Sequence, residues 1–272
     1  MARCVVVLAD GLRPDAITRT HMPALRALGR DYSRALHATT IRPSVTVAAL
    51  TSLATGVSPA THGLVEPGLG FLARLGSLKP VARELGRQRV KTIVAAGAPA
   101  PRNKPVTWAL TTCAGIDKLA LSDGGARDVV FSALPHLDED GFVFVYLPDC
   151  DRAGHAHGWM SGAYLQAAAL VDAAIGVLTS RLEDTLLMVM ADHGGGGVHP
   201  TDHDLPHPTN DHIPVIIAGP TVRRHWTMTA PVSLLDVPPT ILHWFGAPVP
   251  ECYEGRVLHE AFETMVPEVL SA

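Results

Sequence analysis

The stretch at residues 186–197 most constrains this chain, because an apolar run passes directly into a polar, glycine-rich segment. It reads LLMVMADHGGGG. The apolar part is too short for a membrane span and too evenly apolar for a solvent-facing strand, so it predicts a central β-strand covered on both faces. Asp192 and His193 follow at its end, ahead of the glycines, and both residue types bind metals. Taken alone, the pair also fits a turn cap and a surface histidine.

Other short apolar runs predict further buried strands. They lie at residues 4–9, 91–96, 142–147 and 213–219. Segments with helical spacing lie at residues 22–28, 45–54, 78–89, 127–134, 161–182 and 234–245. The stretches 65–77 and 99–122 contain many Gly and Pro residues, and we expect loops with short elements there. This alternation predicts an α/β fold, a three-layer α/β/α sandwich with a central, mostly parallel β-sheet in one domain.

The composition excludes several classes of protein. Hydrophobic residues make up 47% of the 272 residues and charged residues 18%, which excludes a disordered chain. The net charge of -4 shows no general bias, so we expect no binding to nucleic-acid duplexes or membranes. Four cysteines without CxxC spacing suggest reduced thiols. The apolar run at 4–9 is too short for a secretory signal, and we therefore expect a cytoplasmic protein.

Acidic residues follow three of the predicted strands. Asp10, Asp151 and Asp192 come directly after a strand or within a short turn of one. Ligands of open α/β sheets bind outside the carboxyl ends of the strands, so we expect the three carboxylates to share a site. They would repel one another unless cations were present, which favours a metal site. With His155 and His193, the ligands suffice for two ions.

Thr46 lies near the start of the helix expected at residues 45–54. Backbone amides and the helix dipole attract anions there, and nearby metal ions make an oxygen nucleophile usable at neutral pH. By itself Thr46 fits a simple N-cap. Together with the acids and histidines, it is a candidate nucleophile.

With these residues the chain resembles the alkaline phosphatase superfamily, most closely its nucleotide pyrophosphatase/phosphodiesterase branch. The matching segments occur in the family's order and cover most of the chain. They are VVVLADGLRPD at 5–15, MPALRALGR at 22–30, RPSVTVAALTSLATGVSPATHGL at 42–64, DRAGHAHG at 151–158, MADHGGGG at 190–197, IPVIIAGP at 213–220 and SLLDVPPTIL at 233–242. The chain is short for this family, so we expect a single catalytic domain at residues 1–272 without a large cap insertion.

The resemblance implies a site for two divalent metal ions, usually zinc, with manganese as an alternative. One ion would be held by Asp10, Asp192 and His193 together with Thr46. The implied mechanism is in-line attack of the Thr46 oxygen on phosphorus, a phosphothreonine intermediate, and its hydrolysis by water.

The second ion would be held by Asp151, His155 and one histidine of the polar loop before residue 213. The family's last histidine ligand stands at a characteristic distance before this strand, which favours His203. The other loop candidates are His199, His207 and His212.

The chain departs from the family pattern at two places. Ala49 stands where the phosphodiesterase branch usually has an asparagine that holds a phosphoryl oxygen. Substrate orientation must then rely on backbone amides or on Arg42, whose guanidinium suits a phosphate, and His207 is a second candidate for touching substrate. No CxPxR-like motif surrounds Thr46, so sulfate esters rank low.

These inferences predict a metal-dependent phosphodiesterase that acts on a small-molecule phosphate ester. Alternatives with the same fold are a phosphomonoesterase, a phosphonate hydrolase and a phosphomutase. A member of a different class, a non-catalytic metal-binding or anion-binding relative, would also fit the loss of the asparagine at Ala49.

Overall fold

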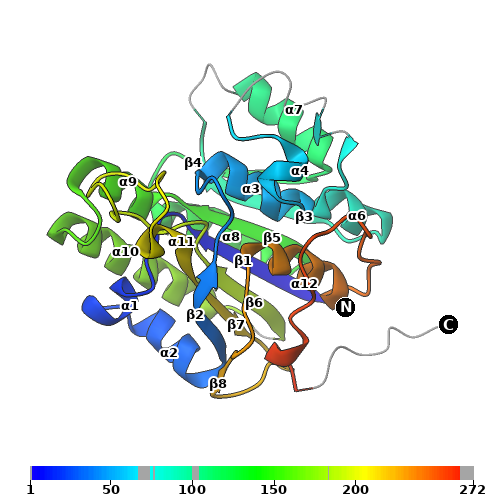
Figure 1. Cartoon of the computed structure of the whole chain (residues 1–272). Helices are drawn as coiled ribbons and strands as arrows, with labels where there is room; N and C mark the ends of the chain where they lie inside the picture. The colour runs from blue at the N-terminus through cyan, green and yellow to red at the C-terminus, as the bar shows by residue number, and fades with distance from the viewer. Residues whose placement is uncertain (1, 67–73, 76, 100–103, 183, 264–272) are drawn as a thin grey trace.

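The computed structural model describes residues 2–66, 74–75, 77–99, 104–182 and 184–263. At its centre lies an eight-stranded sheet with the strand order β4-β3-β5-β1-β6-β7-β2-β8 (Figure 1). The strands are β1 Arg3–Ala9, β2 Ser33–Thr39, β3 Thr92–Gly97, β4 Lys118–Ser122, β5 Gly141–Leu147, β6 Thr185–Met190, β7 His212–Ala218 and β8 Trp226–Thr227. β7 runs antiparallel to both of its neighbours, β6 and β2, and the other adjacent strands are parallel. The predicted mostly parallel sheet is confirmed.

Helices form two layers, one on each face of the sheet (Figure 1). In one layer α10 packs on α2 and α8, and in the other α12 packs on α3 and α6. The bounds are α2 Pro23–Asp31, α3 Thr46–Thr55, α6 Val81–Arg87, α8 Ala126–Ala133, α10 Gly162–Thr179 and α12 Val237–Trp244. Further helices are α1 Ala16–Arg19, α4 Pro59–His62, α7 Lys104–Ala114, α9 Asp149–His157 and α11 Pro208–Asp211. This arrangement confirms the three-layer α/β/α sandwich.

The middle of the sheet consists of strands that are apolar on both faces. All six residues of β6 are buried, as expected for a strand between two helix layers. β1 lies between β5 and β6 and pairs in parallel with both. The carboxyl ends of β5, β1 and β6 therefore meet at one edge of the sheet.

Two stretches differ from the prediction. Residues 99–122 contain the helix α7 and the edge strand β4, where loops with short elements were expected. The apolar pattern of α7 is weak because most of its described side chains are only partly buried, and Trp108 is 70% exposed. The strand β2 was also missed, since its buried residues only alternate with more exposed ones. The loop expected at residues 65–77 lies mostly outside the described residues.

Among the described helices, only α10 is long and apolar enough to cross a membrane by length and composition. The apolar face of α10, which includes Val171 and Ile175, is buried against the neighbouring elements. Its buried Asp172 accepts hydrogen bonds from the backbone N–H groups of Ala24 (3.0 Å) and Leu25 (2.8 Å), in the first turn of α2. These contacts make α10 a core helix of the sandwich.

Candidate metal centre

Three carboxylates meet at the carboxyl edge of the sheet. Asp10 directly follows β1, Asp192 follows β6 after one residue, and Asp151 lies in the first turn of α9, which begins after β5. The backbone N–H of Gly11 donates to Asp192 Oδ1 at 3.2 Å, and that of Asp151 donates to the carbonyl of Asp10 at 2.9 Å. Gly11 has a φ of +68°, and a Cβ there would lie 2.9 Å from Asp151 Cα. Only glycine lets the three segments approach this closely.

An inner cluster consists of Asp10, Asp192, His193 and Thr46. His193 Nε2 lies 3.3 Å from Asp10 Oδ1 and 3.6 Å from Asp192 Oδ2. It lies 3.2 Å from the hydroxyl oxygen of Thr46, the first residue of α3. The two carboxylates and the imidazole are buried. The structure thus places the candidate nucleophile beside the candidate ligands of one ion.

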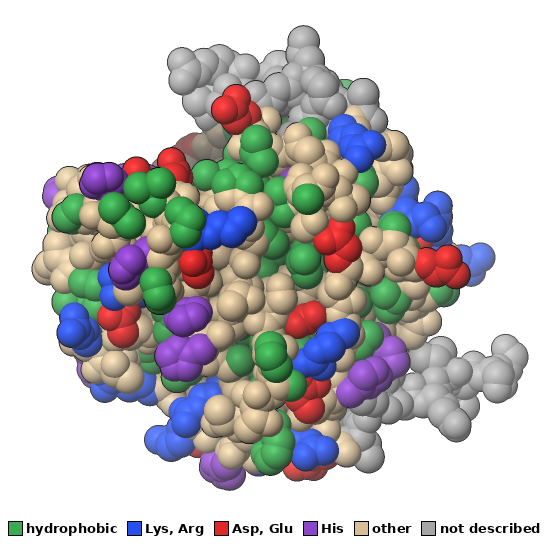
Figure 2. All heavy atoms as spheres, in the orientation of Figure 1, with side chains coloured by type: hydrophobic (Ala, Val, Ile, Leu, Met, Phe, Trp, Pro, Cys, Tyr) green, Lys and Arg blue, Asp and Glu red, His purple; other side chains and the backbone are tan. Residues whose placement is uncertain are grey.

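An outer cluster consists of Asp151, His155 and His203. His155 Nε2 lies 3.3 Å from Asp151 Oδ1 and 3.2 Å from His203 Nε2. Asp151 Oδ1 is also 4.0 Å from His193 Nε2, so this carboxylate lies between the two clusters. The rings of His193 and His203 stack with centroids 3.8 Å apart. On the surface, histidine and charged side chains gather around α11, close to this edge (Figure 2).

The orientation of the three imidazoles fits metal ions. Each Nδ1 donates to a backbone carbonyl: His155 to Thr201 at 2.9 Å, His193 to Gly194 at 2.8 Å and His203 to Ser44 at 2.8 Å. Each Nε2 therefore carries a lone pair that faces the carboxylates. Such outer hydrogen bonds fix the tautomer that a metal requires.

The carboxylates also lack donors on the sides that face the imidazoles. Asp10 Oδ1, Asp151 Oδ1 and Asp192 Oδ2 are buried and have no hydrogen-bond partner among the described residues. Oxygen and nitrogen acceptors thus face one another without hydrogen atoms between them. Divalent cations would satisfy all of these atoms at once, so the residues fit such ions.

Electrostatics support the same conclusion. Burial and, second to it, the negative charge of Asp192 raise the pKa of Asp10 well above its usual range. Burial also raises the pKa of Asp192 to about 7. Burial and the neighbouring His193 lower the pKa of His203 to about 4, so this imidazole is neutral at pH 7. The metal-free site therefore resists ionisation of Asp10 and Asp192, whereas cations would favour it.

Tyr146 is a site residue that the sequence did not reveal. Its hydroxyl, on β5, donates to Asp10 Oδ2 and leaves Oδ1 facing His193. Burial and the nearby carboxylates raise the pKa of Tyr146 well above its usual range, so the hydroxyl keeps its proton. The only signal was its place one residue before the end of the strand, next to β1.

Trp159 was also missed. Its indole N–H donates to the carbonyl of Gly11 at 3.0 Å. Its ring lies against Gly195, where a Cβ would lie 2.1 Å from Trp159 Cε2. The ring also contacts His155 and His203, at centroid distances of 5.1 and 5.6 Å. Glycine in the run 194–197 thus serves close packing against this indole.

Of the two expected substrate contacts, His207 lies on the polar loop, and Arg42 lies between β2 and α3 and contacts that loop. Arg42 forms an ion pair with Asp211 and donates to the carbonyl of Asp204 at 3.2 Å. Nδ1 of His207 accepts a hydrogen bond from the backbone N–H of Thr209 at the start of α11. Both side chains are thereby held by this loop.

The remaining candidates lie away from the two clusters. His199 is exposed, and His212 begins β7 and contacts the ring of His37. Of the loop histidines, His203 is the one found in the described part of the chain with Asp151 and His155. Ala49 is fully buried in the hydrophobic core.

Family comparisons place the chain among metalloenzymes. A family described as type I phosphodiesterase / nucleotide pyrophosphatase matches residues 4–70, and one described as the metalloenzyme superfamily matches residues 113–249. The chain is 33% identical over 141 residues to a phosphopentomutase from Sodalis glossinidius, an overlap of 48% of this chain and 32% of the mutase. It is 30% identical over 103 residues to arylsulfatase K from Gallus gallus, covering 35% of this chain and 19% of the sulfatase. The chain thus spans about a third or less of these curated relatives.

Solved structures share the fold. Human ectonucleotide pyrophosphatase/phosphodiesterase 5 aligns with a TM-score of 0.76 at 12% identity, covering 96% of this chain and all of that chain (100%). A phosphonate monoester hydrolase from Silicibacter pomeroyi aligns with a TM-score of 0.72 at 18% identity, covering 99% of this chain and 78% of that chain.

Proposed function

This chain belongs to the alkaline phosphatase superfamily of metalloenzymes, and from that premise we propose that it hydrolyses small-molecule phosphate diesters through Thr46. The observation that carries the proposal is the convergence of three imidazole Nε2 atoms beside the Thr46 hydroxyl with three buried carboxylate oxygens that have no hydrogen-bond partner in the described part of the chain. The match of residues 4–70 to the phosphodiesterase family favours diesters over other esters.

Divalent metal ions are implied by the superfamily. We propose zinc, or manganese as the alternative, with one ion in the inner cluster (Asp10, Thr46, Asp192, His193) and one in the outer cluster (Asp151, His155, His203). When bound, the ions supply Lewis acidity that lowers the pKa of the Thr46 hydroxyl and offsets negative charge on the phosphoryl group.

Thr46 then attacks phosphorus in line. A bond forms between its oxygen and phosphorus, the bond to the leaving alcohol breaks, and that alcohol takes up a proton. Water then attacks the phosphorus of this threonine ester, the bond between phosphorus and the Thr46 oxygen breaks, and a phosphate monoester leaves while the hydroxyl of Thr46 is restored. The start of α3 has no side-chain cap, so its amides can bind a phosphoryl oxygen in place of the asparagine lost at Ala49. Arg42 and His207 are our candidates for contacts to the ester group.

One hydrophobic core supports the proposal of a single catalytic domain over residues 1–272. It includes Cys4 near the start of the chain, Val145 in the middle and Phe262 near the end of the described residues. A murine ectonucleotide pyrophosphatase/phosphodiesterase 5 of the same fold has been solved in complex with AMP, which makes a nucleotide diester a reasonable first substrate to test.

A phosphomutase is the second candidate function. The relative with 33% identity over 141 residues is a phosphopentomutase, and a phosphothreonine can pass its phosphoryl group to a sugar hydroxyl instead of water. The two activities differ in their products.

The test measures bis-p-nitrophenyl phosphate, p-nitrophenyl phosphate and ribose 1-phosphate as substrates of the zinc-loaded and manganese-loaded protein. We expect fastest turnover of the diester, loss of turnover in Thr46→Ala with both ions retained, and normal turnover in the control Thr18→Ala, an exposed threonine outside the site. Faster release of p-nitrophenol from the monoester, or isomerisation of the pentose phosphate, would contradict the diesterase assignment.

A further inference from the structure

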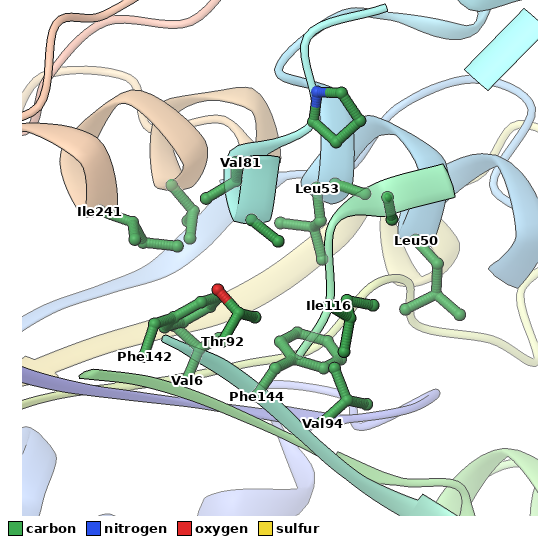
Figure 3. Close-up of a pocket in the computed structure, with 15 residues that line it drawn as sticks. Val6, Leu50, Leu53, Val81, Thr92, Val94, Ile116, Phe142, Phe144 and Ile241 are labelled. Carbon is green, nitrogen blue, oxygen red and sulfur yellow. The ribbon is translucent and has the colours of Figure 1, made fainter. Parts of the chain in front are cut away.

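An apolar cavity of about 200 Å³ lies between the sheet and the layer formed by α3, α6 and α12 (Figure 3). Val6 and Phe142 line it from the sheet, and Leu53, Val81 and Ile241 line it from the three helices. No charged side chain occurs among the described residues around it. The cavity therefore does not suit the anionic ester proposed for the metal centre.

Thr92 is the polar exception in this lining. It is 1% exposed, and its hydroxyl oxygen has no hydrogen-bond partner among the described residues. Figure 3 shows this oxygen directed from β3 into the cavity. The backbone N–H of Thr92 is satisfied, since it donates to Asp117 at 2.7 Å. A buried hydroxyl without a partner is unfavourable, so a ligand that supplies one would relieve this cost.

The size and polarity of the cavity define its occupant. Engineered apolar cavities of about 150 Å³ stay dry and bind benzene, whereas a buried water needs about two to four polar partners. The lining residues that the structure describes offer a single polar side chain, which does not satisfy a water. We infer that the cavity is a binding site for an uncharged apolar molecule with one hydroxyl group, of the phenol or short-chain alcohol class.

This site is separate from the metal centre but shares a helix with it. Leu50, Leu53 and Ala54, in the middle and last turns of α3, line the cavity, whereas Thr46 begins the same helix. Leu50 and Val94 are half-buried and both line the cavity. A molecule bound there would contact α3 away from the clusters of carboxylates and imidazoles.

The experiment titrates the full chain with phenol and with toluene, which have similar shapes and differ in the hydroxyl, by isothermal calorimetry. Thr92→Val removes the hydroxyl at nearly constant volume, and Thr179→Val on α10, in the other helix layer, is the matched control. Val94→Phe fills the cavity. Each titration is repeated in the presence of inorganic phosphate.

We expect one saturable phenol site in the unaltered protein. The ratio of the phenol Kd to the toluene Kd should rise about fivefold in Thr92→Val, the worth of one neutral hydrogen bond, and stay constant in Thr179→Val. Val94→Phe should weaken both ligands, and phosphate should leave both affinities unchanged. Absence of saturable binding, an unchanged ratio in Thr92→Val, or displacement of phenol by phosphate would each overturn the inference.

Discussion

The hydroxyl of Tyr146 orients the carboxylate of Asp10. Tyr146 binds Oδ2 and leaves Oδ1 for the ion proposed in the inner cluster. Tyr146→Phe should therefore lower affinity for that ion about 10-fold or more, as loss of an outer-sphere partner typically does. A chelator competition assay measures the affinity, with Tyr32→Phe, outside the site, as control. Equal affinity in both variants would show that Asp10 needs no such support.

A second prediction concerns His203 and the number of metal ions that the chain binds. His203→Ala should reduce the metal content by one ion per chain, because the outer cluster then keeps only Asp151 and His155. The exposed His199 provides the control, and His199→Ala should keep both ions. Elemental analysis after gel filtration measures the content. Full occupancy in the His203 variant would assign the outer ion to another loop histidine.

Much of the candidate site was predictable because its acids follow strands. Parallel strands bring the residues after them to one edge, so Asp10, Asp151 and Asp192 could be grouped from the sequence. Tyr146 and Trp159 could not, because their contacts to Asp10 and Gly11 depend on how β5 and the loop before α10 pack on β1. Side-chain contacts between elements leave no periodic signal in a sequence.

At the scale of elements, the contact between Trp159 and the glycine loop positions α9. Gly195→Ala would place a methyl group against the indole, so we expect Trp159 and His155 to shift. The shift should lower the free energy of unfolding by roughly 1–3 kcal/mol and weaken the binding of the ion proposed in the outer cluster. Thermal denaturation and tryptophan fluorescence measure the effect. Gly162→Ala is the matched control, since a Cβ there meets nothing within 4 Å. Equal melting temperatures of the two variants would contradict this role of Trp159.

The elements themselves were predictable where burial is complete. β1, β5 and β6 lie between two helix layers and read as continuous apolar runs. β4 lies at one edge of the sheet and β2 near the other, and partial exposure interrupts their apolar pattern. The fold class could therefore be predicted from the central strands, whereas the strands β2 and β4 could be identified only in the structure.

At the scale of the whole molecule, stability should depend on metal and pH together. The pKa of Asp192 rises from its ordinary 3.8 to about 7 in the metal-free fold, and that of Asp10 rises as well. The stabilisation from the protonated form of Asp192 is complete below about pH 4 and lost as pH rises through about 7. Bound metal removes this loss, because it favours the ionised carboxylates.

Chelator treatment should therefore lower the melting temperature more at pH 8 than at pH 5. The free metal also stabilises by mass action, by about 4 kcal/mol when its concentration is about 1,000 times Kd. Differential scanning calorimetry of loaded and stripped protein measures both effects. Asp192→Asn, which cannot ionise, should show a smaller pH dependence after stripping. The same metal-dependent shift at both pH values would mean that these carboxylates ionise without a cation.

The three candidate imidazole ligands are all oriented by main-chain carbonyls, at Thr201, Gly194 and Ser44. A carbonyl is present whatever side chain its residue carries. The side chains of Thr201 and Ser44 can therefore change during evolution without loss of the oxygen atoms that orient the ligands, whereas Gly194 must stay glycine because a Cβ there would lie 1.9 Å from the carbonyl oxygen of Thr209. Side chains around the site can thus change, and with them the substrate that binds, while the orientation of the three imidazoles stays the same.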